Sequence, residues 1–421
     1  MKKSTIYSII CSILFFIELT GVKLSFMPIG LSKLLLLGLT AAFFIDLART
    51  SKNFTIPKHI FALILVWIGL GVYAAMVTVL NGVNDFAFLN KIVYLIYEPV
   101  WTGFIISYFI TRYWNITLID LLIAIANALT LHALLAVAAY LLPPVNALFN
   151  ALLPNLGNLD VEMGLRVKGF TNLGGAWLSS IICLGVIIHL YRMSGIQSWR
   201  GILLGLLKIL VCVAGTFVTG RTGLMLSLLA LATYPLIWIF QPGGKKTFYR
   251  FYGIILLGAI LIYRFTPNID DFVSQDTLNW ALEIFMQGDG EMSTSSTQDL
   301  QSMLYLPDDK TDLIFGIGFY ETAVAGYERS DSGYLKTIFS TGLLGAIVFY
   351  GSYLFLMGHT LWMVKQRYGM PELILITYLY GIFFIVEVKE PYLQTIGIPN
   401  IIFLIYFTLF FNKKFDVQIS H

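Results

Sequence analysis

The chain has 421 residues, of which 57% are hydrophobic and only 12% are charged. Soluble globular domains carry about 25% charged residues, so this composition excludes a soluble enzyme and a disordered protein. The net charge of +3 is small and no basic stripe accompanies it, which excludes a nucleic-acid-binding protein. Long apolar runs recur along the whole sequence, and they predict a polytopic membrane protein.

Twelve apolar segments are candidates for bilayer crossings, each of which takes about 20 residues in a helix. They lie near 4–20, 29–47, 59–80, 91–111, 118–142, 171–191, 201–218, 222–240, 251–266, 334–358, 371–387 and 397–411. The first segment follows two lysines but lacks a small-residue cleavage site, so we interpret it as a membrane helix and not as a signal peptide. We therefore expect an all-α polytopic membrane protein with about 12 transmembrane helices.

The lysines and arginines of the loops predict that both termini are cytoplasmic, because every inner segment then carries cations. Segment 267–333 becomes a large outer loop with 13 of the 24 acidic residues. The sequence divides accordingly into three regions. These are 1–266, with helices 1 to 9 and a smaller outer loop at 143–170; the large outer loop 267–333; and 334–421, with helices 10 to 12 and a cytoplasmic tail.

Nucleotide and metal motifs are absent from the sequence. There is no GxxxxGK[ST] phosphate loop, no HExxH motif and no EF-hand cluster, so we expect no metal and no cofactor. None of the five histidines falls in an outer loop, which argues against a histidine base on that face. Cys11, Cys183 and Cys212 each lie in an apolar run, and we interpret them as small buried hydrophobic side chains.

Outward-facing cations stand immediately before three predicted helix starts. They are Arg166 with Lys168, then Arg221, and then Arg329. Helix N-termini offer free N–H groups and partial positive charge, and a guanidinium group suits phosphate oxygens. The set predicts a pyrophosphate site at the outer surface of the membrane. The alternative is that these side chains reach lipid headgroups or pair with the acidic loop.

Other charges near or within predicted spans are further candidates. Arg264 lies at a predicted helix C-terminus, where the helix dipole alone favours a cation. Glu98 and Lys208 fall in mid-span, where charges usually face the bundle interior, and they pair either with each other or with other groups. Lys389 lies in the charged segment Val386–Pro391, which forms either a simple helix-end charge group or the rim of a cavity beside the arginines.

Six short motifs, taken in order, resemble those of a known family. They are Arg166–Gly174, Thr219–Gly223, Leu313–Gly318, Asp331–Leu335, Thr341–Gly345 and Glu387–Pro391. Their order and spacing resemble the Wzy-type O-antigen and capsule polymerases, which belong to the O-antigen ligase-like group of bacterial membrane glycosyltransferases. The resemblance covers about 160 to 395 and includes the large outer loop.

The resemblance implies a multi-pass protein of the bacterial inner membrane, with both outer loops and the active face in the periplasm. It implies transfer of a growing chain from undecaprenyl pyrophosphate to the terminal sugar of a new lipid-linked unit. The partners would then be undecaprenyl pyrophosphate-linked oligosaccharides, the lipid bilayer, a separate chain-length regulator and a flippase of the same pathway. Because the lipid pyrophosphate activates the donor, neither nucleotide nor metal is implied.

The resemblance also implies roles for individual residues. The pyrophosphate would be held by Arg166, Lys168, Arg221, Arg264, Arg329 and Lys389. Arg221 would also offset charge on the leaving group. The sister ligases carry a histidine in the stretch that corresponds to Asp331–Leu335, and this chain lacks it. By position, Asp331 is the candidate to accept the proton of the attacking hydroxyl or to orient that hydroxyl; its alternative role is the N-cap of the tenth helix. Tyr334, in the same motif, is expected to contact a sugar.

Two other functions stay open for a chain of this kind. One is a lipid-linked oligosaccharide flippase, which also needs many spans and cationic cavity groups. Most of the candidate cations lie at the outer rim and no internal repeat is evident, which favours the polymerase. The other is an O-antigen ligase, which the missing histidine disfavours.

Overall fold

The computed structural model describes residues 3–50, 56–153, 167–172, 174–196, 198–239, 244–265, 303–321 and 330–419. Within these ranges the regular structure is helical, with no β-strand. Nine of the helices are long and apolar enough to cross a membrane. This is the architecture of an α-helical polytopic membrane protein, as the composition predicts.

Each of the twelve predicted segments coincides with a helix. Nine of these helices satisfy the length and hydropathy of a span over the described residues. Two more contribute shorter apolar stretches, Ile6–Thr20 and Ile398–Asn412. The remaining segment, near 251–266, belongs to a helix that begins at Gly244 and carries three cations in its first two turns. A total of twelve crossings therefore stays a prediction.

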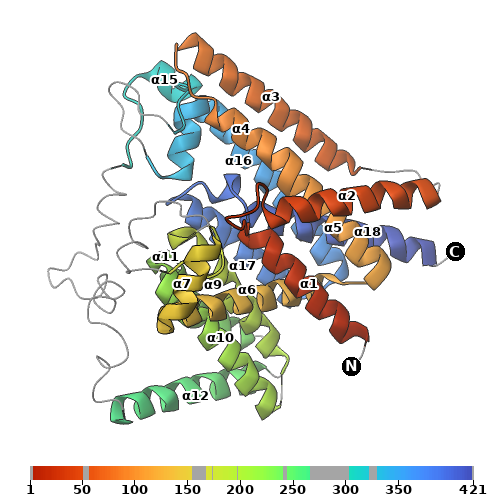
Figure 1. The fold of residues 1–421 in the computed structure, drawn as a ribbon, viewed down its shortest axis with the longest axis vertical. Coiled ribbons are helices and arrows are strands. Elements are labelled where there is room, and N and C mark those ends of the chain that lie inside the picture. Colours follow the sequence, from red (N-terminus) through yellow and green to blue (C-terminus); the bar gives the residue numbers. More distant parts are fainter. Residues whose placement is uncertain are drawn as a thin grey trace. The chain divides into compact units, whose positions relative to one another are not determined.

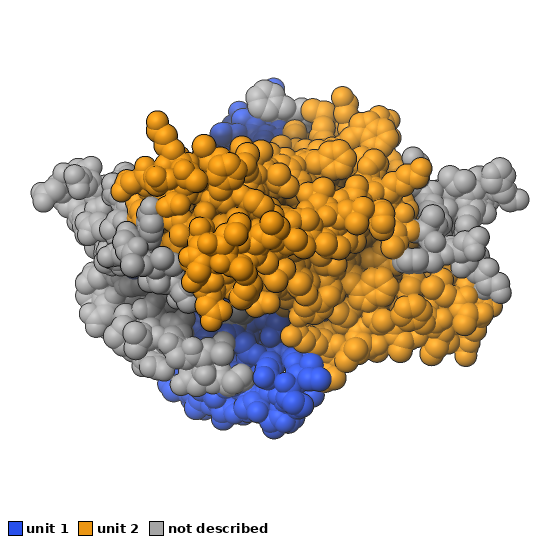
Figure 2. All heavy atoms as spheres, turned by 90° about the horizontal axis from the view of Figure 1, so that it is seen from above, with its two compact units in different colours: residues 1–31, 119–294 blue, residues 32–118, 295–421 orange. Residues whose placement is uncertain are grey.

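The chain divides into two compact units, drawn in blue and orange in Figure 2. Unit 1 comprises Met1–Leu31 and Ile119–Thr294, and unit 2 comprises Ser32–Leu118 and Ser295–His421. Each unit is therefore assembled from two separate stretches of sequence. The predicted pyrophosphate-binding residues are divided between them.

Unit 1 is built around α9. Its helices are α1 (Lys3–Thr20), α6 (Leu118–Leu141), α7 (Pro143–Leu152), α9 (Gly175–Ser194), α10 (Trp199–Thr219), α11 (Arg221–Trp238) and α12 (Gly244–Phe265). α9 is buried along almost its whole length and packs against α10 and α11. A small apolar core that includes Val22, Ala136 and Phe149 also takes in Val167 and Val218, so the segment before α9 packs with the end of α10.

In unit 2, α16 and α18 pack against most of the other elements. These helices are labelled in Figure 1. Its elements are α2 (Leu31–Thr50), α3 (Lys58–Leu80), α4 (Ala87–Leu95), the π-helix η1 (Ile96–Val100), α5 (Trp101–Trp114), α15 (Lys310–Phe315), α16 (Gly333–Arg367), α17 (Met370–Glu387), the 3-10 helix η3 (Tyr392–Gln394) and α18 (Ile398–Ile419). α18 packs against α5, and α16 packs against α3, α15 and α17. The described parts of the predicted outer loop, 303–321 and 330–333, belong to this unit.

The long helix α16 is two helices joined at Gly342. The backbone at Gly342 has φ 65° and ψ −177°, outside the helical region. A Cβ atom there would lie 2.1 Å from the carbonyl oxygen of Ile314, so only glycine lets α15 approach this closely. The kink separates a short first half, which begins at Gly333, from the long second half.

Candidate functional site

In unit 1, two of the motifs meet at the starts of α9 and α11. The amide of Val167 donates to the carbonyl of Val218 over 3.1 Å, which joins the segment before α9 to the end of α10. The amide of Gly223 donates to Oγ of Ser179 over 3.1 Å. A Cβ atom at Gly223 would lie 2.1 Å from the backbone of Ser179, so the missing side chain is what lets α11 touch α9.

This contact brings the N-termini of two helices together, and two of the predicted cations lie at or before these helix starts in the sequence. α9 begins at Gly175 and α11 at Arg221, and neither helix has a side-chain N-cap. Both starts therefore contribute partial positive charge. Lys168, only 7% exposed, lies just before α9, and Arg221 is the partly exposed first residue of α11. The arrangement suits an anion.

The other predicted cations are described less completely. Arg166 and Arg329 lie outside the described residues, and Arg264 lies near the end of α12. Lys389, in unit 2, follows α17 and is partly exposed. The predicted convergence of Arg166, Arg221 and Arg329 on one pyrophosphate therefore stays a prediction.

In unit 2, the start of α16 lies on the buried side chain of Glu387. Ser332 occupies the N-cap position of α16, so the alternative in which Asp331 caps the helix is wrong. The side chain of Asp331 is exposed, as a proton acceptor for an incoming substrate must be. A Cβ atom at Gly333 would lie 2.3 Å from Oε1 of Glu387, so this glycine allows the motif at 331–335 to contact the motif at 387–391.

The carboxylate of Glu387 is engaged on both oxygens. The hydroxyl of Tyr350 donates to Oε1 over 3.0 Å, and the amide of Leu393 donates to Oε2 over 2.8 Å. Nε2 of Gln394 donates to Oγ1 of Thr337 over 2.8 Å, and Thr337 shares a hydrogen bond of 3.1 Å with Tyr350. Through these hydrogen bonds Glu387 links α17 to α16 and η3. Because Glu387 is fully buried, it does not line an accessible rim.

Tyr334, the predicted sugar contact, is partly engaged by the protein itself. Its hydroxyl donates to the carbonyl of Phe384 over 2.9 Å. Its ring lies 4.8 Å from the ring of Tyr350, centroid to centroid. The side chain is partly exposed, so a contact of its ring with a sugar stays a prediction.

The motif at 313–318 packs against the kink of α16, where Gly342 approaches the backbone of Ile314. α15 and α16 are labelled in Figure 1. The amides of Ile317 and Gly318 both donate to the carbonyl of Phe339, over 2.8 and 3.0 Å, and so cap the first half of α16. Side chains at the end of α3 hold the carbonyls of the same loop. The contacts are Tyr73 to Phe315 at 2.8 Å, Thr78 to Gly318 at 3.0 Å and Asn81 to Ile317 at 3.0 Å.

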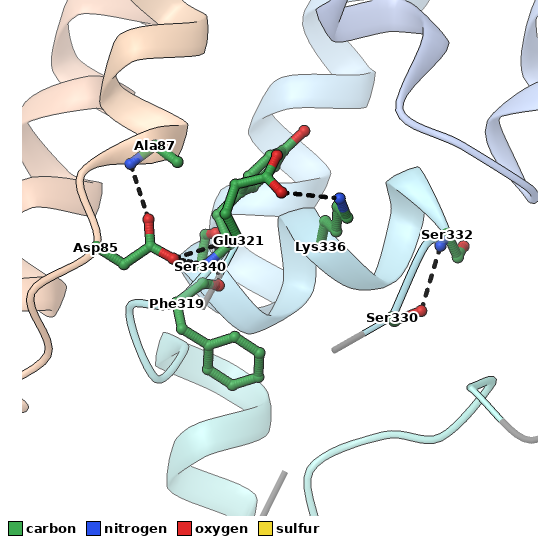
Figure 3. Close-up of polar contacts among 9 residues, drawn as sticks. Asp85, Ala87, Phe319, Glu321, Ser330, Ser332, Lys336 and Ser340 are labelled. Carbon is green, nitrogen blue, oxygen red and sulfur yellow. Dashed lines mark hydrogen bonds and ion pairs between the residues drawn. The ribbon is translucent and has the colours of Figure 1, made fainter. Parts of the chain in front are cut away.

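Asp85 fixes the far end of this loop, as Figure 3 shows. Its Oδ2 accepts hydrogen bonds from the amides of Tyr320 and Glu321, over 2.8 and 2.7 Å. Its Oδ1 accepts from the amide of Ala87 at the start of α4, over 2.9 Å. Asp85 is only 6% exposed, and its carboxylate accepts hydrogen bonds from three amides. These bonds connect the start of α4 to the loop and fix the position of the Glu321 backbone.

Lys336, in the first turns of α16, faces Glu321 (Figure 3). Its Nζ lies 3.5 Å from Oε2 of Glu321, and the two side chains are 6% and 38% exposed. The same ammonium lies 5.2 Å from the ring centroid of Tyr320. Lys91 of α4 is within electrostatic range of both Glu321 and Lys336. The sequence analysis missed this group, and the signal that marks it is Lys336 itself, a cation inside a predicted span.

Glu98 and Lys208 each interact with another group of their own unit. Nζ of Lys208 donates to Oδ1 of Asn127 over 2.6 Å. Glu98, buried in η1, lies within electrostatic range of Lys33 and beside the hydroxyl of Tyr97. Of the two alternatives for these intramembrane charges, the structure favours pairing with other groups.

The cysteines are buried and unpaired, which confirms their interpretation as small apolar side chains. Among the residues that the structure describes, no group of three or more His, Cys, Asp or Glu is arranged to hold a metal ion. The candidate groups, each unit taken by itself, are cations and helix N-termini in unit 1 and carboxylates and cations in unit 2.

No protein-family model matches the chain, and the comparison with curated proteins found no match. The class of the protein rests on its fold, which is that of an α-helical polytopic membrane protein. The resemblance of the motifs to those of the Wzy-type polymerases stays a prediction.

Proposed function

We propose that this protein is a polymerase of lipid-linked oligosaccharide repeat units, such as those of O-antigen or a related surface polysaccharide. It transfers the growing chain from undecaprenyl pyrophosphate to the terminal sugar of a new lipid-linked unit, at the periplasmic face of the inner membrane. The observation that supports the proposal is the contact between the starts of α9 and α11 in unit 1, with Arg221 as the first residue of α11 and Lys168 in the segment that precedes α9. Paired helix starts and cations suit a pyrophosphate group.

The packing of unit 2 supports the same proposal. Four of the motifs behind the resemblance pack around the first half of α16, and the motif at 387–391 comes from the far end of α17. Gly333 lies on Glu387, and Gly342 lies on Ile314. Residues of the motifs at 313–318 and 331–335 also share a small apolar core, through Ile317 and Leu335. Such clustering is expected if the motifs are parts of one site.

The proposed reaction uses the activation already present in the donor. The hydroxyl oxygen of the acceptor sugar attacks the anomeric carbon of the donor chain, and a new C–O bond forms. The bond between that carbon and the phosphate oxygen breaks, and undecaprenyl pyrophosphate leaves with the electron pair. Asp331 accepts the proton of the attacking hydroxyl. Arg221 offsets the negative charge that develops on the leaving pyrophosphate.

The test is incubation of the purified full chain, in lipid nanodiscs, with a lipid-linked repeat unit and no nucleotide. We expect a ladder of products, and Arg221→Ala should lower the rate of chain growth about 100-fold, as loss of one preorganised charge at a leaving group does. Arg200→Ala, at an exposed position on the predicted inner side, is the matched control and should leave the rate unchanged.

Two outcomes would contradict the polymerase. Movement of the labelled lipid-linked unit across the bilayer without any chain growth would indicate a flippase. Transfer of preformed polysaccharide to lipid A core, with no change of chain length, would indicate a ligase.

A further inference from the structure

The start of α12 is held against the end of α11 by one face of the helix. A Cβ atom at Gly244 would lie 2.0 Å from the carbonyl oxygen of Trp238, so the two backbones touch there. The buried ring of Phe251 packs edge-on against the ring of Trp238, with 5.3 Å between the centroids. The hydroxyl of Tyr252 donates to the carbonyl of Leu231 over 3.1 Å. These contacts lie within unit 1 and fix which face of α12 points outward.

The outward face of α12 changes in character along the helix. Lys245, Lys246 and Tyr249 are exposed in its first two turns. Residues three or four positions apart share a helix face, and Leu256 and Ile260 are exposed residues that continue this one. A face that is basic and aromatic at one end and apolar at the other fits the boundary between lipid headgroups and hydrocarbon.

The start of α10 shows the same change and lies beside the start of α12. Trp199, the first residue of α10, is exposed, and its ring centroid lies 4.9 Å from the guanidinium carbon of Arg250. Leu203 and Leu207 follow on the same face of α10 and are exposed as well. Tryptophan and tyrosine are enriched where a membrane meets water. Both helices therefore begin with aromatic and basic side chains and continue with an apolar exposed face.

No carboxylate of this part of the chain neutralises the two lysines. The sequence has no aspartate or glutamate between Glu162 and Asp270. Over the residues that the structure describes, neither Lys245 nor Lys246 makes a hydrogen bond or an ion pair. Arg250 follows Lys246 by four positions, a spacing at which like charges are unfavourable. This group of cations therefore attracts an anion from outside the chain.

We propose that Lys245, Lys246, Tyr249 and Trp199 form a binding site for the headgroup of an anionic phospholipid such as phosphatidylglycerol. The phosphate lies against the two ammonium groups, and the acyl chains follow the apolar part of the same helix face. A soluble anion would match the lysines but not the apolar surface that continues from them. The cations of the loops predict that this end of α12 is cytoplasmic, so the lipid belongs to the inner leaflet. The site does not depend on the proposed function.

A fluorescent label on the same helix face can detect lipid at this site. Gly253 is exposed one turn beyond Tyr249, and a Cβ atom there meets nothing within 4 Å. The full chain with Gly253→Cys carries bimane on this cysteine, since the native cysteines are fully buried. It is reconstituted in phosphatidylcholine nanodiscs that contain a small fraction of doxyl-labelled phosphatidylglycerol or doxyl-labelled phosphatidylcholine. Because doxyl quenches bimane on contact, the quenching gives the relative association of the two lipids with the site.

We expect a preference of about fivefold or more for phosphatidylglycerol, the contribution of a single cation near a membrane surface. Lys245→Gln with Lys246→Gln should bring the two lipids to nearly equal association, whereas Lys245→Arg with Lys246→Arg should keep the preference. Lys58→Gln with Lys365→Gln removes the same number of exposed cations elsewhere and is the matched control, which should leave the preference unchanged. Unchanged quenching by phosphatidylcholine shows that α12 of each variant is still in place.

Equal association of both lipids with the unsubstituted site, or a preference that survives the double glutamine variant, would overturn the proposal. Inorganic pyrophosphate, added at constant ionic strength, distinguishes the source of the phosphate. If it abolishes the preference, the lysines bind a free phosphate group and the assignment to a lipid is wrong. If the preference persists, the headgroup is recognised together with its acyl chains.

Discussion

At Gly333, a hydrogen atom stands where any other residue would place a carbon 2.3 Å from the carboxylate of Glu387. We expect Gly333→Ala to lower the free energy of unfolding by about 1–3 kcal/mol, the usual cost of overpacking a buried contact. Thermal unfolding of the purified protein measures it. Gly351→Ala, in the same helix, is the control, because a Cβ atom there meets nothing within 4 Å. Equal melting temperatures of the two variants would show that the start of α16 can shift to accommodate the added methyl group with no loss of stability.

Some of the candidate residues could be chosen from the sequence because they lie at or before helix starts. Arg221 and Lys168 could be chosen because a cation beside a helix N-terminus is visible in the order of residues alone. Lys336 and Glu321 could not be chosen as a pair, because their contact depends on the loop that Asp85 fixes over 200 residues away in sequence. Asp331 was predicted with two roles, and the structure removes the role of N-cap.

Among the elements, α16 differs most from its prediction. Hydropathy predicts one span over 334–358, and the structure has a helix at 333–367 that is broken at Gly342. Glycine is common in membrane helices, so the sequence gives no sign that this one adopts a positive φ. The cause is the close approach of α15, a contact that no local pattern reveals.

The short helix α15 depends on Asp309, its N-cap. The amides of Thr311 and Asp312 donate to Oδ1 of Asp309 over 2.6 and 3.2 Å. These hydrogen bonds, first the one from Asp312 and then the one from Thr311, lower the pKa of the Asp309 carboxyl below its usual 3.8. A lowered pKa means that the stabilisation is complete above about pH 5 and is lost as the pH falls below about 4.

A spin label on Lys310→Cys, at the first residue of α15, reports this transition. We expect its mobility to be constant from neutral pH to about pH 5 and to rise below about pH 4. Adding Asp309→Ala should make the label mobile at every pH, whereas Asp308→Asn should leave the profile unchanged. A mobility that does not respond to Asp309→Ala would rule out the N-cap as the group that holds α15.

For the molecule as a whole, hydropathy predicts the class of fold and the positions of the helices, since apolar length is a local property of the sequence. The division of the chain into two units cannot be predicted from hydropathy. Each is made of two stretches separated by a long intervening segment, so nothing in a hydropathy profile marks their boundaries. The division of the candidate cations between the units follows from packing alone.

The orientation of the chain can be tested with cysteine substitutions, because the native cysteines are fully buried. Lys310→Cys lies in the predicted outer loop and Arg200→Cys on the predicted inner side, and both positions are exposed. In intact cells freed of their outer membrane, a membrane-impermeant maleimide should label Lys310→Cys and leave Arg200→Cys unlabelled until the cells are opened. The reverse pattern would invert the topology and move the candidate site to the cytoplasm.

The interleaving of the two units also sets an order of events during synthesis. Unit 1 has all its residues once the ribosome passes residue 294, whereas unit 2 must wait for the C-terminal stretch 295–421. At about 5–20 residues per second, helices α3 to α5 spend many seconds in the bilayer before α16 and α18 reach them. During that interval Asp85 lacks the amides of Tyr320 and Glu321. A ribosome that stops soon after residue 294 would therefore leave a nascent chain in which unit 1 has all its residues, whereas unit 2 is incomplete and exposes Asp85 without these two partners to quality-control proteases.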